Sequence, residues 1–159
     1  MGLDMYLHAT KSISNFKFEV ERRGESEEFD SIVRACNAYD IITDDSPFVT
    51  VDFTAMYWRK ANAIHQWFVD NCQGGVDECQ RSYVTRGQLV ELLNLCKKVA
   101  LEPANAGDVL PTQGGFFFGS TEYDEWYHSD IKRTITGLER VLAEVPDDYS
   151  WSFYYQSSW

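Results

Sequence analysis

The sequence predicts a single α+β domain over residues 1–159, with a mainly antiparallel sheet and about four helices. Three observations lead to this prediction. The length of 159 residues is that of one domain. Segments with the two-residue alternation of strands are mixed irregularly with segments of helical periodicity. No segment repeats at a fixed period, and the intervals between strands do not form the regular strand–helix–strand units of a parallel sheet.

Four segments alternate apolar and polar residues, as half-buried strands do. In the first of them, Leu3, Met5 and Leu7 lie on one side. We expect the second to pair with the first across a turn at residues 12–15. The four predicted strands are residues 2–8, 16–21, 48–53 and 151–155, with a short extended segment at 82–84. An apolar run between glycines, residues 115–119, predicts a further short, buried strand.

Helical periodicity of 3.6 residues marks four other segments. The predicted helices are residues 27–39, residues 54–71, a helix opened by Thr85 whose apolar stripe reaches Val99, and a helix from residue 120 or 121 to about 144. Ser26 is expected to cap the first of these helices. Thr85 and Gln88 form the pattern of a capping box, and Gly74 and Gly75 are expected to end the second helix. Residues 103–115 are predicted to be loop.

Charge and cysteine content indicate the surroundings of the protein. The chain has 14 Lys and Arg against 25 Asp and Glu, a net charge of −11, which argues against direct binding of nucleic acid or of anionic membrane surfaces. No apolar run reaches the roughly 20 residues of a membrane span, and the first residues lack the basic start of a signal peptide. We therefore expect a cytoplasmic protein.

The cysteines favour a reducing compartment and no metal site. Cys36 and Cys96 fall on the apolar stripes of predicted helices, where a free cysteine behaves as a small hydrophobic residue. The stripe that holds Cys36 consists of Phe29, Ile32, Val33, Cys36 and Tyr39. Cys72 and Cys79 are separated by six residues, which is not the short spacing of a zinc knuckle. We predict neither a metal nor another cofactor.

One candidate site lies on the predicted helix at residues 54–71. Trp58, Asn62 and His65 follow each other at spacings of four and three residues, which places them on one edge of a helix. A histidine beside an amide and an indole can act as a general base or hold a ligand. The alternative is that Asn62 and His65 are hydrogen-bonded residues at the border of the core.

A second candidate lies between residues 114 and 127, where aromatic and polar residues are crowded together. The residues singled out there are Phe117, Thr121, Glu122, Asp124 and Trp126. Polar atoms at a helix start beside aromatic walls are the ingredients of a small-molecule pocket. The alternative is an ordinary capped helix start next to a buried strand. A third feature is the C-terminal Trp159, which we expect to pack against the body of the protein or against a partner.

Five blocks of the sequence carry a resemblance to a known family. The blocks are Gly2–Leu7 (GLDMYL), Tyr57–Val69 (YWRKANAIHQWFV), Leu110–Gln113 (LPTQ), Gly115–Asp124 (GFFFGSTEYD) and Phe153–Trp159 (FYYQSSW). They resemble a family of small uncharacterised proteins of tailed bacteriophages and prophages that has no established activity. The resemblance leaves residues 9–55 unmatched. It implies a setting, the cytoplasm of a bacterial host, and places the first two candidate sites on family blocks.

Two functions are compatible with these observations. The first is a non-enzymatic phage accessory protein that binds a host, defence or phage protein and alters its activity, with a DNA-mimicking surface as a special case. It is favoured by the small size, the acidity, the abundance of Trp and Tyr, and the lack of the common nucleophile, phosphate-loop and dinucleotide motifs. The alternative is a small-ligand-binding module or small enzyme, with a pocket formed by the helix at 57–69 and the segment at 115–125.

Overall fold

The fold is α+β with an antiparallel sheet, as the sequence predicts. The computed structural model describes residues 2–15, 23–42 and 46–159. In chain order the elements are β1 (Asp4–Ser14), α1 (Arg23–Ala35), β2 (Phe48–Arg59), α2 (Asn62–Cys72), β3 (Ser82–Val84), α3 (Arg86–Leu101), a 3-10 turn (Pro103–Asn105), α4 (Ala106–Val109), α5 (Glu125–Glu144) and β4 (Trp151–Ser158). None of the described helices is long and apolar enough to cross a membrane.

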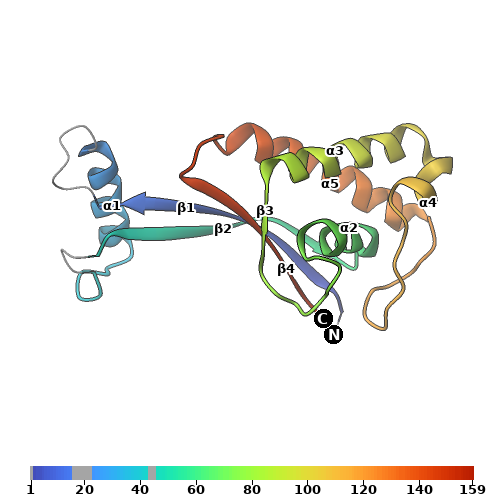
Figure 1. The fold of residues 1–159 in the computed structure, drawn as a ribbon, viewed down its shortest axis with the longest axis horizontal. Coiled ribbons are helices and arrows are strands. Elements are labelled where there is room, and N and C mark those ends of the chain that lie inside the picture. Colours follow the sequence, from blue (N-terminus) through green and yellow to red (C-terminus); the bar gives the residue numbers. More distant parts are fainter. Residues whose placement is uncertain (1, 16–22, 43–45) are drawn as a thin grey trace.

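The sheet has the order β2-β1-β4-β3 with every described pairing antiparallel. Strand β1 pairs with β2 from Asp4 to Ser14, whereas its pairing with β4 ends at Lys11. Beyond that point β1 and β2 continue as a two-stranded arm that carries α1 at its far end (Figure 1). The two termini lie side by side at the opposite end of the sheet, where Asp4 faces Ser158.

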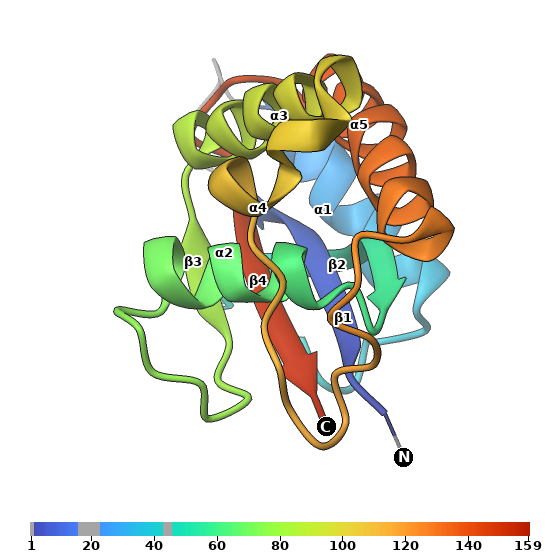
Figure 2. The ribbon, with the colours of Figure 1, turned by 90° about the vertical axis from the view of Figure 1, so that its right-hand side faces the viewer.

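One face of the sheet carries the main core. The side chains of Leu3, Met5 and Leu7 are fully buried there, and α2, α3 and α5 pack on this side (Figure 2). Each buried leucine contributes roughly 1.5–3 kcal/mol. A smaller cluster of Ile13 from β1 with Phe29 and Val33 fixes α1 to the arm.

The arm region departs from the prediction. The predicted turn at residues 12–15 is wrong, because Ser12 to Ser14 continue β1. The strand predicted at residues 16–21 lies outside the described residues. Helix α1 runs from Arg23 to Ala35, so the predicted cap Ser26 lies inside the helix and not at its start. Cys36 and Tyr39 are exposed beyond that end, so only the first part of the predicted stripe is buried.

The predicted helix at residues 54–71 is a strand for its first third. Strand β2 runs to Arg59, and α2 begins only at Asn62. Met56 and Trp58 point into the core while Tyr57 and Arg59 point out, which is the two-residue period of a strand. At Lys60 the backbone takes a φ of 60°, which ends the strand. The helical spacing of Tyr57 and Trp58 relative to α2 is therefore coincidental.

Other local predictions are confirmed. Thr85 and Gln88 form the reciprocal capping box at the start of α3. Gly74 and Gly75 take φ angles of 66° and 78° after α2, and the Gly75 N–H donates to the Val69 carbonyl. The stripe of α3 from Leu89 to Val99 is buried.

Two predictions between α3 and α5 need correction. The predicted loop at 103–115 contains a 3-10 turn and the short α4. The last helix begins at Glu125, later than the predicted start at residue 120 or 121.

Candidate functional site

Trp58 is a core residue and not part of a helix edge. It lies on β2, is fully buried, and its indole N–H donates to Thr134 Oγ1 of α5 at 2.8 Å. Its predicted place beside Asn62 and His65 on one helix is therefore wrong. The hydrogen bond with Thr134 satisfies the only polar atom of a large apolar side chain, as a buried tryptophan requires.

His65 belongs to a buried hydrogen-bond network. Its Nε2 lies 2.9 Å from Asp77 Oδ2 and its Nδ1 lies 2.7 Å from the Tyr155 hydroxyl. A carboxylate only accepts, so Nε2 carries the proton, and Nδ1 accepts from Tyr155. Burial lowers the pKa of His65 even though Asp77 opposes this shift, which keeps the ring neutral. The network positions α2 against β4.

The C-terminal tryptophan joins the same network. Trp159 Nε1 donates to Asp77 Oδ2 at 2.9 Å, and its ring contacts Phe117 and Phe118. Of the two alternatives for this residue, the structure shows packing against the body.

Asn62 brings the two candidate sites together. Its Nδ2 donates to the carbonyls of Phe118 at 3.1 Å and Ser120 at 2.7 Å, and its Oδ1 accepts from the backbone of Gln113 at 3.2 Å. Three hydrogen bonds of Asn62, the first residue of α2, thus hold both sides of the loop between α4 and α5. The role of Asn62 is to position this loop.

Residues 115–119 form a turn at the tip of that loop, which corrects the predicted buried strand. The Phe118 N–H donates to the Gly115 carbonyl at 3.1 Å, and Gly119 has a φ of 88°. Phe116 is 96% exposed, while the Phe118 ring packs edge-on against His65. The three consecutive phenylalanines do not all pack in the core, because neighbouring side chains in a tight turn point in different directions.

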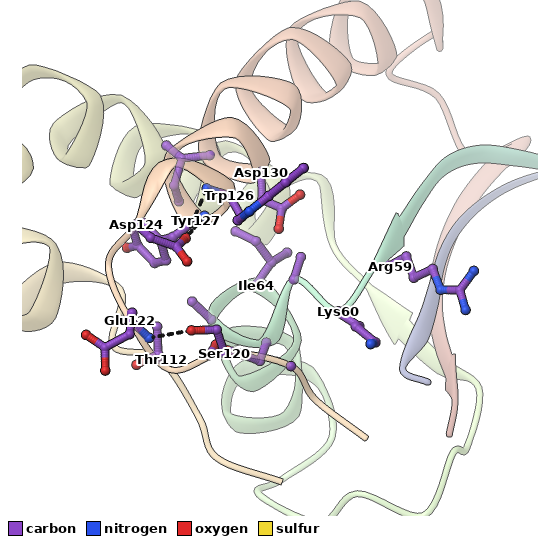
Figure 3. A pocket seen from close by; sticks show the side chains of 15 residues that line it. Arg59, Lys60, Ile64, Thr112, Ser120, Glu122, Asp124, Trp126, Tyr127 and Asp130 are labelled. Carbon is purple, nitrogen blue, oxygen red and sulfur yellow. Dashed lines mark hydrogen bonds between the residues drawn. The ribbon is translucent and has the colours of Figure 1, made fainter. Parts of the chain in front are cut away.

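A pocket of about 410 Å³ lies between the start of α2, the loop and the first turns of α5 (Figure 3). Its lining includes four of the predicted site residues, namely Asn62, Glu122, Asp124 and Trp126. The other four, Trp58, His65, Phe117 and Thr121, do not line it. A volume of this size is in the range of small-ligand sites.

The α2 side of the pocket offers hydrogen-bond donors. Ala61 occupies the N-cap position and provides no side-chain acceptor. The backbone N–H groups of Ala63 and Ile64 have no acceptor among the described residues, although both residues are buried. The first N–H groups of any helix have no acceptor within the helix, and here they face the pocket without a side-chain cap. Lys60, which also lines the pocket, has no ion pair within the described part of the chain.

The α5 side is acidic. The carboxylate of Asp124 already has hydrogen-bond partners, because its Oδ1 accepts from the N–H groups of Trp126 and Tyr127 and caps α5. Asp130 is half-buried, and its carboxylate makes no hydrogen bond or ion pair to any described residue. Burial raises the pKa of Asp130 to about 6, with Asp124 adding to the shift and Arg133 opposing it. Trp126, four residues earlier and 73% exposed, lies beside it on the helix (Figure 3).

Sequence reasoning missed Asp130. Its spacing of four from Trp126 was the available signal, because it places a carboxylate and an indole on one helix face. Among the residues with described positions, no group of three or more His, Cys, Asp or Glu could hold a metal ion. No protein-family model, curated protein or solved structure matches this chain.

The His65 network predicts a stability effect. Tyr155→Phe removes the donor to His65 Nδ1 and leaves a buried acceptor unpaired, so we expect a loss of roughly 1–3 kcal/mol in the free energy of unfolding. Urea unfolding measures it. The matched control is Tyr154→Phe, the same change at the preceding residue, whose hydroxyl makes no hydrogen bond to any described residue and which points to the other face of the sheet. Equal stability of the two variants would contradict the assigned network.

Proposed function

We propose that this protein is a binding module for a small zwitterion, held in the pocket between α2 and α5. One observation carries the proposal: unpaired backbone donors at the start of α2 and the unpaired carboxylate of Asp130 line the same pocket. A ligand that has both an anionic and a cationic group would satisfy both sides.

The anionic group of the ligand belongs at the start of α2. The N–H groups of Ala63 and Ile64 lie at the positive end of the helix dipole, and Lys60 adds a full charge. The cationic group belongs at Asp130, where the Trp126 ring provides a cation–π surface. Ile64, Tyr127 and Ile131 supply apolar walls between the two ends.

Glycine betaine is a suitable first probe, because its ammonium and carboxylate keep their charges from pH 4.5 to 8. We expect saturable binding in isothermal titration calorimetry at pH 7.5, and a loss of about tenfold or more in affinity for Asp130→Asn, the size of one charge-assisted contact. Asp108→Asn, the same change at an exposed site outside the pocket, is the control. The zwitterion assignment fails if tetramethylammonium binds as tightly, and the pocket assignment fails if neither probe binds.

The raised pKa of Asp130 predicts opposite effects on binding and stability. Affinity for glycine betaine should fall as pH drops through about 6, because the carboxylate becomes protonated. Between about pH 4 and 6 the folded state binds more protons at this site than the unfolded state, so stability falls as pH rises through that window. Asp130→Asn should therefore melt at a higher temperature than the natural protein at pH 7.5, and the difference should narrow below pH 6. A lower melting temperature at pH 7.5 would show that the carboxylate is stabilising.

A second candidate function, the phage accessory protein that binds a host or defence protein, is favoured by the uncovered face of the sheet. Tyr6, Tyr57, Tyr83 and Tyr154 lie on the side opposite the main core, and tyrosines are common anchors of protein interfaces. The resemblance to phage and prophage proteins supports a setting in the host cytoplasm. The carboxylate of Asp52 on this face is paired with Arg81 at 2.6 Å, so we place the interface on the tyrosines rather than on a DNA-like row of free charges.

Affinity capture from a bacterial host lysate tests this second function. We expect a stoichiometric partner that is lost with the double change Tyr83→Ser and Tyr154→Ser and retained with Tyr39→Ser, an exposed tyrosine that follows α1 on the arm. Retention by all variants would exclude this face as the interface. Competition by duplex DNA, with a steep loss in salt, would instead support the DNA-mimicking form.

A further inference from the structure

A second hollow lies further along α5 than the pocket, between this helix and β2. It measures about 590 Å³, and we call it the basic groove. Its lining consists of residues 54–57 of β2 together with Ser129, Lys132, Arg133, Thr136, Gly137 and Arg140 of α5. Three of these side chains are cationic and none is a carboxylate, in a protein with 25 acidic and 14 basic residues. All three cations come from α5.

The groove is shaped by two backbone features. The register of β2 against β1 shifts between Leu7 and His8, which leaves Ala55 as an extra residue in a bulge. The Ala55 carbonyl accepts from Arg140 Nη2 at 2.8 Å. Gly137 lets α5 approach the strand, since a Cβ at this position would lie 2.1 Å from Met56 Cε. The floor of the groove is therefore fixed by backbone and buried side chains.

The cations of the groove are available for a ligand. Elsewhere basic residues are paired, as in Arg81–Asp52 at 2.6 Å and Lys97–Glu139 at 2.7 Å. Lys132, Arg133 and Arg140 form no ion pair in the part of the chain that the structure describes. Arg133 lowers the pKa of Asp130, which lines the zwitterion pocket, but the two side chains form no ion pair.

Helical spacing brings these groups to one ligand. Lys132, Thr136 and Arg140 recur every four residues along α5, over about 12 Å, and Ser129 and Arg133 form the adjacent row. Lys132 and Arg140, at the two ends of this row, have side chains long enough to reach a ligand bound between them. Thr54 and Ser129 add hydroxyl donors beside the cations, whereas the Thr136 hydroxyl already donates to the Lys132 carbonyl at 3.2 Å. Arginine forks with hydroxyl donors match the several acceptor oxygens of a phosphate group better than the single charge of a carboxylate.

We propose that the basic groove binds a compact phosphorylated small molecule with at least two phosphate groups. A small polyanion satisfies three cations within about 590 Å³. A nucleic-acid strand would extend beyond the groove onto a surface with a net charge of −11, which repels further phosphates. This inference concerns a site separate from the zwitterion pocket and does not depend on it.

Binding of inorganic tripolyphosphate tests the proposal. We expect saturable binding in calorimetry at fixed ionic strength, weakened about tenfold or more in the double variant Lys132→Gln and Arg133→Gln, because charge-assisted hydrogen bonds are lost. The control is Arg34→Gln with Lys98→Gln, which removes the same charge from exposed positions outside the groove. All four positions are exposed, and thermal melting verifies that both double variants fold.

Three outcomes would overturn the proposal. Equal weakening in both double variants would show a general charge effect and no site. Citrate binding as tightly as tripolyphosphate would show an anion site without preference for phosphate. Single-stranded DNA binding more tightly than tripolyphosphate, and lost in the groove variant, would assign the groove to nucleic acid instead.

Discussion

Strand β1 is the element on which the rest of the structure depends. It pairs with β2 along its whole length and with β4 from Asp4 to Lys11, so it fixes the register of both. The buried row of Met5 and Leu7 on this strand, with Leu3 just before it, determines which face of the sheet the helices cover. A shift of one residue would turn every one of these side chains to the opposite face.

The bulge in β2 follows from this constraint. The apolar residues Val49 and Val51 have odd numbers, whereas Met56 and Trp58 have even numbers, yet all face the same side of the sheet. Only an extra residue between them allows this, and Ala55 is that residue. A requirement of the two cores thereby creates the bulge whose Ala55 carbonyl accepts from Arg140 in the basic groove.

Helix α5 lines both proposed sites. Its buried stripe, which includes Tyr127, Ile131 and Leu138, packs on the core. Trp126, Asp130, Arg133 and Arg140 follow each other at spacings of four, three and seven residues, so they lie along one border of that stripe. Arg133 lowers the pKa of Asp130 without forming an ion pair with it. The two sites therefore share one side of α5 and differ in the turns of the helix that line them.

The sequence predicts those parts of the fold that local chemistry determines. The capping box of Thr85 and the glycines after α2 were predictable because each depends on a few neighbouring residues. The boundary between β2 and α2 could not be predicted from local sequence, because Tyr57 and Trp58 are compatible with a strand or with a helix. Their pairing with β1, which is distant in the sequence, makes them part of the strand. The site was half predictable for the same reason. Asn62 and Trp126 were predicted and line the pocket. Asp130 can be recognised only in the folded structure, where its carboxylate is half-buried and has no hydrogen-bond or ion-pair partner among the described residues.

The choice of alanine at position 61 bears on what the pocket is for. Serine, threonine or aspartate at an N-cap stabilises a helix by about 1 kcal/mol relative to alanine. The chain uses such a cap at Thr85 for α3 and at Asp124 for α5, whereas α2 has none. Ala61 is small and buried, which leaves both the N–H groups of α2 and the space in front of them free. The cavity therefore has two walls that each lack a stabilising interaction: α2 has no side-chain cap, and the carboxylate of Asp130 has no partner among the described residues. Such a coincidence is typical of a binding site, where groups left unpaired in the free protein are satisfied by the ligand.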